Sequence, residues 1–550
     1  MPKNYEIKFE DCFNLPNPGL RSYFDIVRKG QPDEYRTPFA KGQQVEQVLK
    51  DWEPHLSQLS DTWPTLVEFE NDLRKKVGPM SIMKPLSQRI SDIDNYYDDI
   101  LLPSKPICNS AIKAVIAECN PIRGLQVRRQ SLTVANMKKS TNSGAPFFTK
   151  RRNVVDKTMF CNTYAFQDNV WMYQGAKKFH YIHDAVYSKE SWNNFWMGAA
   201  VLGWRGQEGG PKHEDVKQRV VWMFPFAVNI NELQVYQPLI EACQRANIVP
   251  AWVSMESVDD RVTRMFDTKG PDDLVICTDF SKFDQHFNHN LQNAAHDIIE
   301  GIFTHSQEES GISWWLKDVF PIKYTIPLAY DYGKIRTGRH GMGSGSGGTN
   351  ADETLVHRAL QYEAAISAGQ RLNPNSQCLG DDGILTYPGI TVEDVMRSYT
   401  AHGQEMNATK QYVSTQDCVY LRRWHHKDYR INNVCVGVYS TYRALGRLCE
   451  QERYYDPEVW GPKMVALRQL SIIENVKNHP LRDEFAEFCM KRDKYRLGID
   501  IPGFLDNIET IAQEATDVMP DFLGYTKSQQ KNAETGISNW WIVKYLKSKA

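Results

Sequence analysis

The chain has 550 residues, of which 41% are hydrophobic and 24% are charged, and its formal net charge is −2. This length allows two to four domains or one large multi-lobed unit, and the hydrophobic content is sufficient for a substantial core. The nearly balanced charge gives no support to a polyanion partner, so any nucleic-acid binding must depend on local clusters of basic residues.

Three patterns argue against other classes of protein. The sequence has no apolar N-terminal segment and no long apolar run, so we expect neither a standard secretion signal nor a membrane partner. The eleven cysteines include no CxxC pair, which indicates buried thiols in a reducing compartment. The pairs His180 with His183 and His425 with His426 lack a third ligand at a suitable spacing, so we expect ordinary histidines and no zinc site.

Residues 1–120 contain short apolar patterns and prolines, which predict helices joined by loops. The stretch 92–100, DIDNYYDDI, is acidic and aromatic. It does not fit an EF-hand, because it has no Gly at the sixth loop position and no suitably spaced Glu. We expect a solvated acidic turn there.

A basic segment follows, from Arg123 to Arg152, with eight Arg and Lys residues and no Asp or Glu. Solvated faces usually mix both signs of charge, so this run favours a surface that faces a polyanion. Inside it, the sequence TNSGAPFF, residues 141–148, predicts a stiff bend between basic flanks.

The next segments predict strands that carry charged residues. A Gly-rich turn precedes a strand in which Lys217 and Arg219 are two residues apart and therefore point to one face. Two cations on one face suit a triphosphate, although the same pattern occurs on ordinary surfaces. The apolar run before Asp279 predicts a buried strand that ends in an acid, and Asp284 follows in a loop.

A glycine-rich loop over 338–348 leads into a predicted helix that Thr349 or Asn350 caps and that ends near Gly369. The glycines match G-x-G-x-x-G, but no apolar strand immediately precedes them, so we exclude a dinucleotide site. A Walker A loop is excluded because the Gly-Lys-Ser/Thr ending is missing.

The sequence CLGDDGILTYPG, residues 378–389, places two acids between glycines and apolar residues. It predicts a β-hairpin with Asp381 and Asp382 at its tip, where Gly380 and Gly383 permit unusual backbone angles. If Asp279 lies beside this tip, three carboxylates share one pocket and require a cation, for which Mg²⁺ or Mn²⁺ is better suited than zinc. Two such ions support phosphoryl or nucleotidyl transfer.

In order, the D-x₄-D strand end, the S-G-x₃-T loop and the G-D-D hairpin resemble motifs A, B and C of viral RNA-dependent RNA polymerases. The resemblance continues with a motif G around Ser143, a motif F at Lys217 and Arg219, and a possible motif E over 418–429. Gly403, Asn407 and Lys410 are similar to motif D. The run SGSGGTNADETLVHRALQ most resembles picobirnavirus polymerases, from viruses with double-stranded RNA genomes.

The resemblance implies an α/β (α+β) right-hand polymerase fold with fingers, palm and thumb in a closed arrangement. An N-terminal extension over 1–70 would bridge fingers and thumb. The other expected segments are fingers over 71–265, palm with motif A over 266–288, a fingers or palm insertion over 289–337, palm with motifs B to E over 338–445, and thumb over 446–550.

The resemblance also implies the roles of individual residues. Asp279 and Asp381 would be the main ligands of two Mg²⁺ or Mn²⁺ ions, with Asp382 as a weaker ligand or partner, and Lys410 would donate a proton to pyrophosphate. The expected nucleotide-binding residues are Arg205, Lys217, Arg219, Asp284, Ser344, Thr349 and Asn350. The expected contacts with template RNA are Ser143, Gly144, Pro146, Lys150, Arg151, Arg152 and Gly345.

The sugar of the product is predicted from Asp284, which in the family faces the ribose and can accept a hydrogen bond from its 2′-OH. Reverse transcriptases resemble this architecture but carry a bulky aromatic there and usually another before the paired acids, so an RNA product is favoured. Much of the family has an Asn four residues after the motif B Thr, where this chain has Glu353. Asn350 directly follows this Thr and Asp352 lies between the two positions, so which of Glu353, Asn350 and Asp352 joins Asp284 stays open. We favour Ser344 and Thr349 for this role, with Asn350 as a weaker third.

The expected function is template-directed addition of ribonucleotides to an RNA 3′ end, for viral genome replication and transcription. The expected partners are RNA template and product, ribonucleoside triphosphates and a viral capsid protein, in the host cytoplasm or inside the virion. The alternatives are a non-catalytic RNA-packaging or scaffold protein and a reverse transcriptase. The C-terminal segment after Gly536 fits an ordinary thumb helix or a tail that regulates initiation.

Overall fold

The computed structural model describes residues 18–145, 147–156, 158, 164–167, 170–173, 199–304, 311–518 and 536–550. Three residues discussed above, Pro146, His180 and His183, lie outside these ranges. Within them, no helix has the length and apolar character that crossing a membrane requires. The nine described cysteines are free thiols, and all except Cys108 are buried.

The helices longer than one turn are α2 (Pro18–Lys29), α3 (Val45–Ser57), α4 (Pro64–Arg74), α5 (Ile90–Asp98), α6 (Asn109–Glu118), α7 (Gln130–Ala135), α9 (Phe226–Ala246), α11 (Met255–Thr268), α12 (His289–Ile302), α13 (Ile312–Asp318), α15 (Thr349–Ser367), α16 (Val392–Thr400), α17 (Thr441–Cys449), α18 (Pro457–Glu474), α19 (Arg482–Arg492), α20 (Ile508–Val518) and α22 (Trp541–Lys549). Two short helices are α10 (Pro250–Val253) and α14 (Ile322–Thr325).

The strands are β1 (Tyr35–Arg36), β2 (Tyr164–Gln167), β3 (Val170–Tyr173), β4 (Ala200–Gln207), β5 (Lys217–Met223), β6 (Val275–Thr278), β7 (Leu328–Asp331), β8 (Lys334–Arg336), β9 (Gln377–Leu379), β10 (Asp382–Leu385), β11 (Tyr412–Ser414), β12 (Asp417–Tyr420), β13 (Arg423–His426), β14 (Val438–Tyr439) and β15 (Glu450–Gln451).

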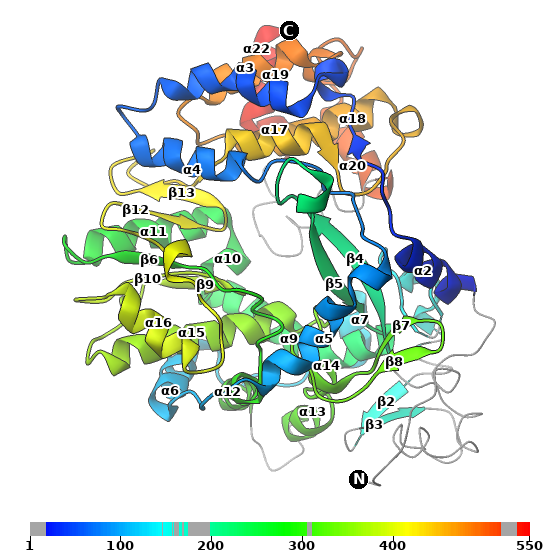
Figure 1. Cartoon of the computed structure of the whole chain (residues 1–550), viewed down its shortest axis with the longest axis vertical. Helices are drawn as coiled ribbons and strands as arrows, with labels where there is room; N and C mark the ends of the chain where they lie inside the picture. Colours follow the sequence, from blue (N-terminus) through cyan, green and yellow to red (C-terminus); the bar gives the residue numbers. More distant parts are fainter. Residues whose placement is uncertain are drawn as a thin grey trace.

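The N-terminal segment connects two distant parts of the chain. Helix α2 packs against β4 and β7, while α3 and α4 pack against α17. Strand β1 pairs antiparallel with β15, which directly follows α17. In Figure 1 this dark blue segment runs from α2, beside the β4 sheet, up to α3 above α17. It therefore spans the expected fingers and thumb.

Two four-stranded sheets carry the predicted cations Arg205, Lys217 and Arg219 and the predicted acid Asp382. The first has the order β5-β4-β7-β8, so the strands of the expected insertion join those of the expected fingers. The second has the order β11-β6-β10-β9, with β10 antiparallel to both of its neighbours. Figure 1 shows β6, β9 and β10 on one side of the molecule, separated from β4 and β5. All strand pairs of this second sheet are antiparallel, and its strands come from the segments expected to form the palm.

Helix α15 is the central support of the palm sheet. It packs against α6, α12, α16 and β9, and thirteen of its nineteen residues are buried. A helix that is buried on nearly every side must be surrounded by other elements, which explains its low amphipathicity. A second hydrophobic core joins α3 and α4 to the C-terminal helices from α17 onward. After residue 446 the described chain is mostly helical, with α18, α19, α20 and α22.

Two local predictions are wrong. The expected acidic turn at 92–100 is mostly helix α5, because Ile93, Tyr96 and Tyr97 share one helical face and are buried. Thr349 is the first residue of α15 and does not cap it, because its hydroxyl donates back to the carbonyls of Gly343 and Ser346. The predicted end near Gly369 is confirmed by its positive φ of 69°.

Candidate active site

The predicted acids lie at one edge of the palm sheet. Asp279 directly follows β6, whose four residues are all buried. Gly383 of β10 pairs with Thr278, so the antiparallel register places Asp382 opposite Asp279. Asp381 occupies the turn between β9 and β10, where Leu379 pairs with Asp382. Two segments about a hundred residues apart therefore place their acids side by side.

The hairpin needs its two glycines for different reasons. Gly380 has a φ of 58° and makes the left-handed part of the turn. Gly383 is needed for space, because a Cβ there would lie 2.6 Å from the His357 ring. The prediction that Gly380 permits an unusual backbone angle is confirmed, whereas the reason given for Gly383 is wrong. Nδ1 of His357 also donates a hydrogen bond to the Gly380 carbonyl, 2.8 Å away, so the ring packs against the turn.

The acids repel one another. Burial, followed by the nearby charge of Asp284, raises the pKa of Asp381, and Asp279 contributes in the same direction. Carboxylates that raise each other's proton affinity favour a bound cation, since a cation removes the repulsion. This crowding is the electrostatic signature expected of a divalent metal site.

Asp382 is held by a neighbouring hairpin. Its Oδ2 accepts a hydrogen bond of 2.7 Å from the backbone N–H of Leu421. Leu421 and Arg422 have φ values of 55° and 57°, so they form the tight turn between β12 and β13. Burial and the charge of Asp381 raise the pKa of Asp382 to about 7. This bond gives the segment predicted as motif E a direct contact with the paired acids.

Asp279 is fixed through its backbone. Its N–H donates to Oε1 of Gln411 at 2.8 Å, and Nε2 of Gln411 donates to its carbonyl at 2.8 Å. Gln411 directly follows Lys410, which is exposed at the end of a short 3₁₀ helix, Ala408–Lys410. These two hydrogen bonds between Gln411 and Asp279 hold the chain next to Lys410, the predicted proton donor, close to the acids. The Lys410 side chain is exposed to solvent.

Glu353 is a buried acid that stands where much of the family has an Asn, and it is one of the residues left open as a partner of Asp284. It lies one turn into α15 and is 5% exposed. Burial and the proximity of Asp284 raise its pKa well above the usual value, and Asp284 lies within hydrogen-bonding reach. A carboxyl group that stays protonated can donate to the Asp284 carboxylate, as the family's Asn amide could.

The predicted triphosphate cations share one face of the β4–β5 pair. Arg219 lies opposite Arg205 and Lys217 opposite Gln207, so all these side chains point the same way. Arg219 is exposed, and its guanidinium donates to the Gln207 side chain. Arg205 is 63% exposed and forms an ion pair of 3.2 Å with Glu452. The prediction that Lys217 and Arg219 share a strand face is confirmed.

Further cations near this face were missed by sequence reasoning. Glu208 pairs with Arg443 of α17 and lies 3.5 Å from Arg422. Burial and the positive charges of Lys76, Arg422 and Arg219 lower the pKa of Lys217. A small pocket beside them is lined by Leu73, Lys76, Val77, Gly78, Met80, Glu208, Arg443, Gly446 and Arg447.

This cluster, which comprises Lys76, Lys217, Arg219, Arg422, Arg443 and Arg447, has an excess of positive charge over Glu208. The four missed members come from the N-terminal segment, the β12–β13 turn and α17, so only the folded chain unites them. The spacing of Arg443 and Arg447, four residues apart on one helix, was the available signal.

The glycine loop, residues 343–348, packs against β5. A Cβ on Gly345 would lie 1.5 Å from the carbonyl oxygen of Trp222, so this position requires Gly. Ser344 donates to the carbonyl of Val220 at 3.2 Å. Asn350 accepts a bond of 2.7 Å from the Trp252 indole, which leaves its amide NH₂ as the free donor near the Gly380 turn. The structure thus places the predicted motif B residues between β5 and the acids.

The template bend, described over residues 143–145 and 147–152, packs against the start of α9. The carbonyl of Ser143 accepts the N–H of Phe226 at 2.8 Å, and Gly144 has a φ of 61°. Lys150 and Arg152 are exposed, as an RNA contact requires. Arg151 points inward, where it donates to Asn229 at 2.7 Å and lies over the Phe226 ring. Burial lowers its pKa to about 10.

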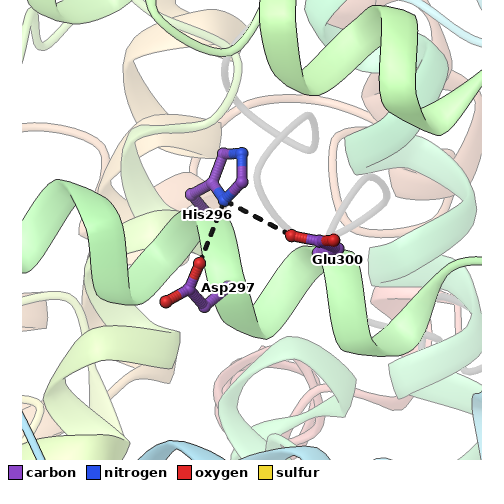
Figure 2. A group of neighbouring side chains, drawn as sticks. All are labelled: His296, Asp297 and Glu300. Carbon is purple, nitrogen blue, oxygen red and sulfur yellow. Dashed lines mark hydrogen bonds and ion pairs between the residues drawn. The ribbon is translucent and has the colours of Figure 1, made fainter.

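A different group of side chains has possible metal-ligand atoms close enough together to bind one ion. Among the described residues, His296, Asp297 and Glu300 place three possible ligand atoms within 4.8 Å of one another. Figure 2 shows them on one helix, α12, with both acids directed at His296. Its Nδ1 lies 3.1 Å from Asp297 and 3.7 Å from Glu300. Because both acids are exposed and already pair with the imidazole, this group is explained as surface ion pairs.

The palm acids do not reach that spacing, because Asp382 is turned toward Leu421. Their donors nevertheless fit a hard divalent cation, since they are carboxylate oxygens crowded together, and Asp279 and Asp381 are exposed to solvent. Asp279 and Asp381 are the two acids that remain available to it.

Comparisons with known proteins give one result. The sequence model of the family described as viral RNA-dependent RNA polymerase matches residues 81–430. A protein of human picobirnavirus (strain Human/Thailand/Hy005102/-), named potential RNA-dependent RNA polymerase, is 62% identical over 543 residues and 98% of both chains.

Two solved structures of the RNA-dependent RNA polymerase of a human picobirnavirus are also similar. One has a TM-score of 0.89 at 60% identity, and an insertion-loop deletion mutant has 0.87 at 58%, each covering 98% of both chains. This likeness confirms the predicted right-hand fold.

Proposed function

The chain belongs to the family of viral RNA-dependent RNA polymerases, and from that premise we propose which of its residues carry the reaction. It is an RNA-directed RNA polymerase, and neither the scaffold protein nor the reverse transcriptase is supported. The observation that carries the residue assignment is the β6–β10 register, which places Asp279 beside the Asp381 turn. The cationic strand face is near enough for the charge of Arg219 to offset part of the burial-driven rise in the pKa of Asp381.

Asp279 and Asp381 hold the divalent ions in this proposal, with Asp382 as a supporting residue. Mg²⁺ or Mn²⁺ bound there would lower the proton affinity of the attacking 3′-hydroxyl and stabilise charge on the leaving phosphate oxygen. Asp382 instead anchors the β12–β13 turn through Leu421. Its carboxylate sets the position of the Asp381 turn.

Arg219 and Lys217 bind the triphosphate, and Arg205 and Arg422 extend the same cationic surface. A guanidinium pairs two phosphate oxygens at once, whereas an ammonium acts as a point charge. Ser344, Thr349 and Asn350 border the nucleotide. Lys410, exposed beside Asp279, protonates the pyrophosphate as it leaves.

Asp284 reads the ribose 2′-OH. Glu353 joins it in this proposal, because it is the buried carboxyl within hydrogen-bonding reach of Asp284. Asn350 contributes from its free amide NH₂. A hydrogen bond to the 2′-OH selects ribonucleotides over deoxynucleotides.

Template RNA runs along the exposed side of the basic segment, where Lys150 and Arg152 contact its phosphates. Ser143, Gly144 and Gly345 shape this path without contributing charge, and Arg151 supports it from inside. Pro146 belongs to the same bend in the sequence. A viral capsid protein as partner, and a location in the host cytoplasm or the virion, complete the proposal by analogy with the picobirnavirus relative.

The test is incorporation of labelled ribonucleotides on a single-stranded RNA template with Mg²⁺ or Mn²⁺. We expect product from the intact chain, product formed about a hundredfold or more slowly by Asp381→Asn, and normal product from the matched control Asp297→Asn on the surface of α12. An unchanged rate in Asp381→Asn would contradict a role of the palm acids in the reaction. Loss of ribonucleotide incorporation in Asp297→Asn would indicate that the group of His296, Asp297 and Glu300 takes part in the reaction.

A further inference from the structure

Helix α9 lies between the template bend and the glycine loop and contacts both. Its first residue, Phe226, bonds to the Ser143 carbonyl of the bend. One turn further, its Asn229 and Glu232 are three residues apart, and they share one helix face. Both are buried, with exposed fractions of 4% and 1%. Buried polar side chains require hydrogen-bond partners, and these two find theirs in the two loops.

Asn229 bonds to both loops at once. Its Oδ1 accepts the bond of 2.7 Å from Arg151 of the template bend. Its Nδ2 donates at 3.3 Å to the carbonyl of Gly345 in the glycine loop and at 3.0 Å to Glu232. Only an amide side chain offers an acceptor and two donors of this size. The network itself fixes which atom is oxygen, because an arginine can only donate.

Glu232 completes the link on the side of the glycine loop. Its carboxylate accepts from the Ser346 hydroxyl and, at 3.1 Å, from the Gly347 N–H. Ser346 in turn accepts the N–H of Gly348 at 3.0 Å, so the acid holds the loop over three consecutive residues. One helix, α9, therefore joins the template bend to the glycine loop.

We propose that Asn229 and Glu232 are positioning residues that couple the template bend to the glycine loop, so that the two loops move together when the template advances by one nucleotide. This inference rests on the proposed function. Arg151 belongs to the link and not to the RNA-binding surface, because its guanidinium is already engaged by Asn229 and the Phe226 ring.

The coupling predicts a split between two kinetic measurements. Addition of one nucleotide to a preassembled primer and template needs no template movement, whereas successive additions need one movement per cycle. Loss of the link should therefore slow successive additions and spare the first.

The variants Asn229→Asp and Asn231→Asp make a matched pair. Asn231 is on the same helix and is 1% exposed, but its side chain bonds to Gln130 and to the Ala227 carbonyl, away from both loops. Asn229→Asp keeps the acceptor for Arg151, removes the donor to Gly345 and adds repulsion with Glu232. If this variant fails to fold, by its circular dichroism spectrum, Asn229→Ala replaces it.

The experiment measures single and successive ribonucleotide additions with the full chain. We expect Asn229→Asp to slow successive additions about fivefold to tenfold, with the first addition near the wild-type rate, because the lost bonds matter only when the loops move. Asn231→Asp should change neither. A double variant with Glu232→Gln should be no slower than Asn229→Asp alone, since both break one link.

Equal effects of the two Asn variants, or equal slowing of first and successive additions by Asn229→Asp, would overturn the coupling. A wild-type chain that binds RNA but incorporates no ribonucleotide would instead overturn the proposed function, so the two failures are distinguishable.

Discussion

Asp382 and Leu421 are joined by a hydrogen bond of 2.7 Å from the Leu421 N–H to the Asp382 carboxylate. The bond separates the roles of the paired acids, because it occupies Asp382 and leaves Asp381 in the turn. The acids are neighbours in the chain, yet one faces the β12–β13 turn and the other faces Asp284 and Asp279.

Replacement of the paired acids should therefore have unequal effects. Asp381→Asn removes a metal ligand and should lower the rate of incorporation about a hundredfold or more, as loss of a group that stabilises transition-state charge does. Asp382→Asn keeps a carbonyl oxygen for the Leu421 N–H, so we expect a loss of about tenfold. The rates should be measured over a range of Mg²⁺ concentrations. Equal losses in both variants would show that the acids share one role.

Arg219→Lys should weaken nucleotide binding although it preserves the charge. The guanidinium can pair two phosphate oxygens, and an ammonium cannot, so KM for the ribonucleotide should rise about tenfold with a smaller change in kcat. Arg397→Lys is the control, since Arg397 is exposed on α16 and pairs with Asp394 at 3.1 Å, outside the cationic surface. Steady-state kinetics with a primed template would decide, and an unchanged KM in Arg219→Lys would contradict the assignment.

Glu353→Gln and Glu353→Ala should differ in ribose selection. A buried, protonated carboxyl donates to Asp284, and a Gln amide can do the same, so Glu353→Gln should keep the preference for ribonucleotides. Glu353→Ala leaves Asp284 without this donor and should reduce the preference about tenfold, while Asp284→Ala should reduce it about a hundredfold. Competition between ribonucleotides and 2′-deoxynucleotides is the measurement. A loss in Glu353→Gln as large as in Glu353→Ala would show that the charge of Glu353 is needed.

Local sequence patterns predicted the parts of the site that depend on short stretches of chain. The run before Asp279 forms a buried strand, the G-D-D stretch forms a hairpin, and Lys217 and Arg219 share a strand face. The apolar run predicts the buried strand, the glycine before the two acids predicts the hairpin turn, and the spacing of two residues predicts the shared strand face. These patterns need no knowledge of distant partners.

The parts that were missed depend on contacts between distant segments. Hydrogen bonds between distant segments link Leu421 to Asp382 and Gln411 to Asp279. The cations of α17 likewise approach the β4–β5 strands only in the folded chain. The charges of the stretch 92–100 predict a solvated turn, whereas the burial of Tyr96 and Tyr97 on one face favours a helix. The sequence predicts Thr349 as a cap of α15, because it does not show that the Thr349 hydroxyl donates to a carbonyl of the glycine loop. The domain boundaries and the assigned residue roles stay predictions.

The contact between β1 and β15 should respond to pH through Glu450. Burial and a hydrogen bond with Glu34 raise the pKa of Glu450 to about 9. A carboxyl group with a raised pKa in the folded chain contributes stability at low pH, and that contribution is lost as the pH rises through about 9.

Glu450→Gln removes this titration. The unfolding temperature of wild type should therefore fall relative to Glu450→Gln as the pH is raised from about 5 to about 9. Glu452→Gln, two residues further and more exposed, is the control. A constant difference between wild type and Glu450→Gln over this range would contradict the raised pKa.

Gly345→Ala should be far more harmful than Gly347→Ala, although both positions belong to the glycine loop. A Cβ on Gly345 would lie 1.5 Å from the backbone carbonyl of Trp222 in β5, which cannot move without disturbing the strand. A Cβ on Gly347 would meet the Leu233 side chain at 3.1 Å, and that side chain can shift. We expect Gly345→Ala to slow elongation about tenfold or more and Gly347→Ala about twofold, because displacement of backbone costs several times more than rotation of a side chain. Elongation on a long RNA template is the measurement, and an unchanged rate in Gly345→Ala would show that the loop does not need its close approach to β5.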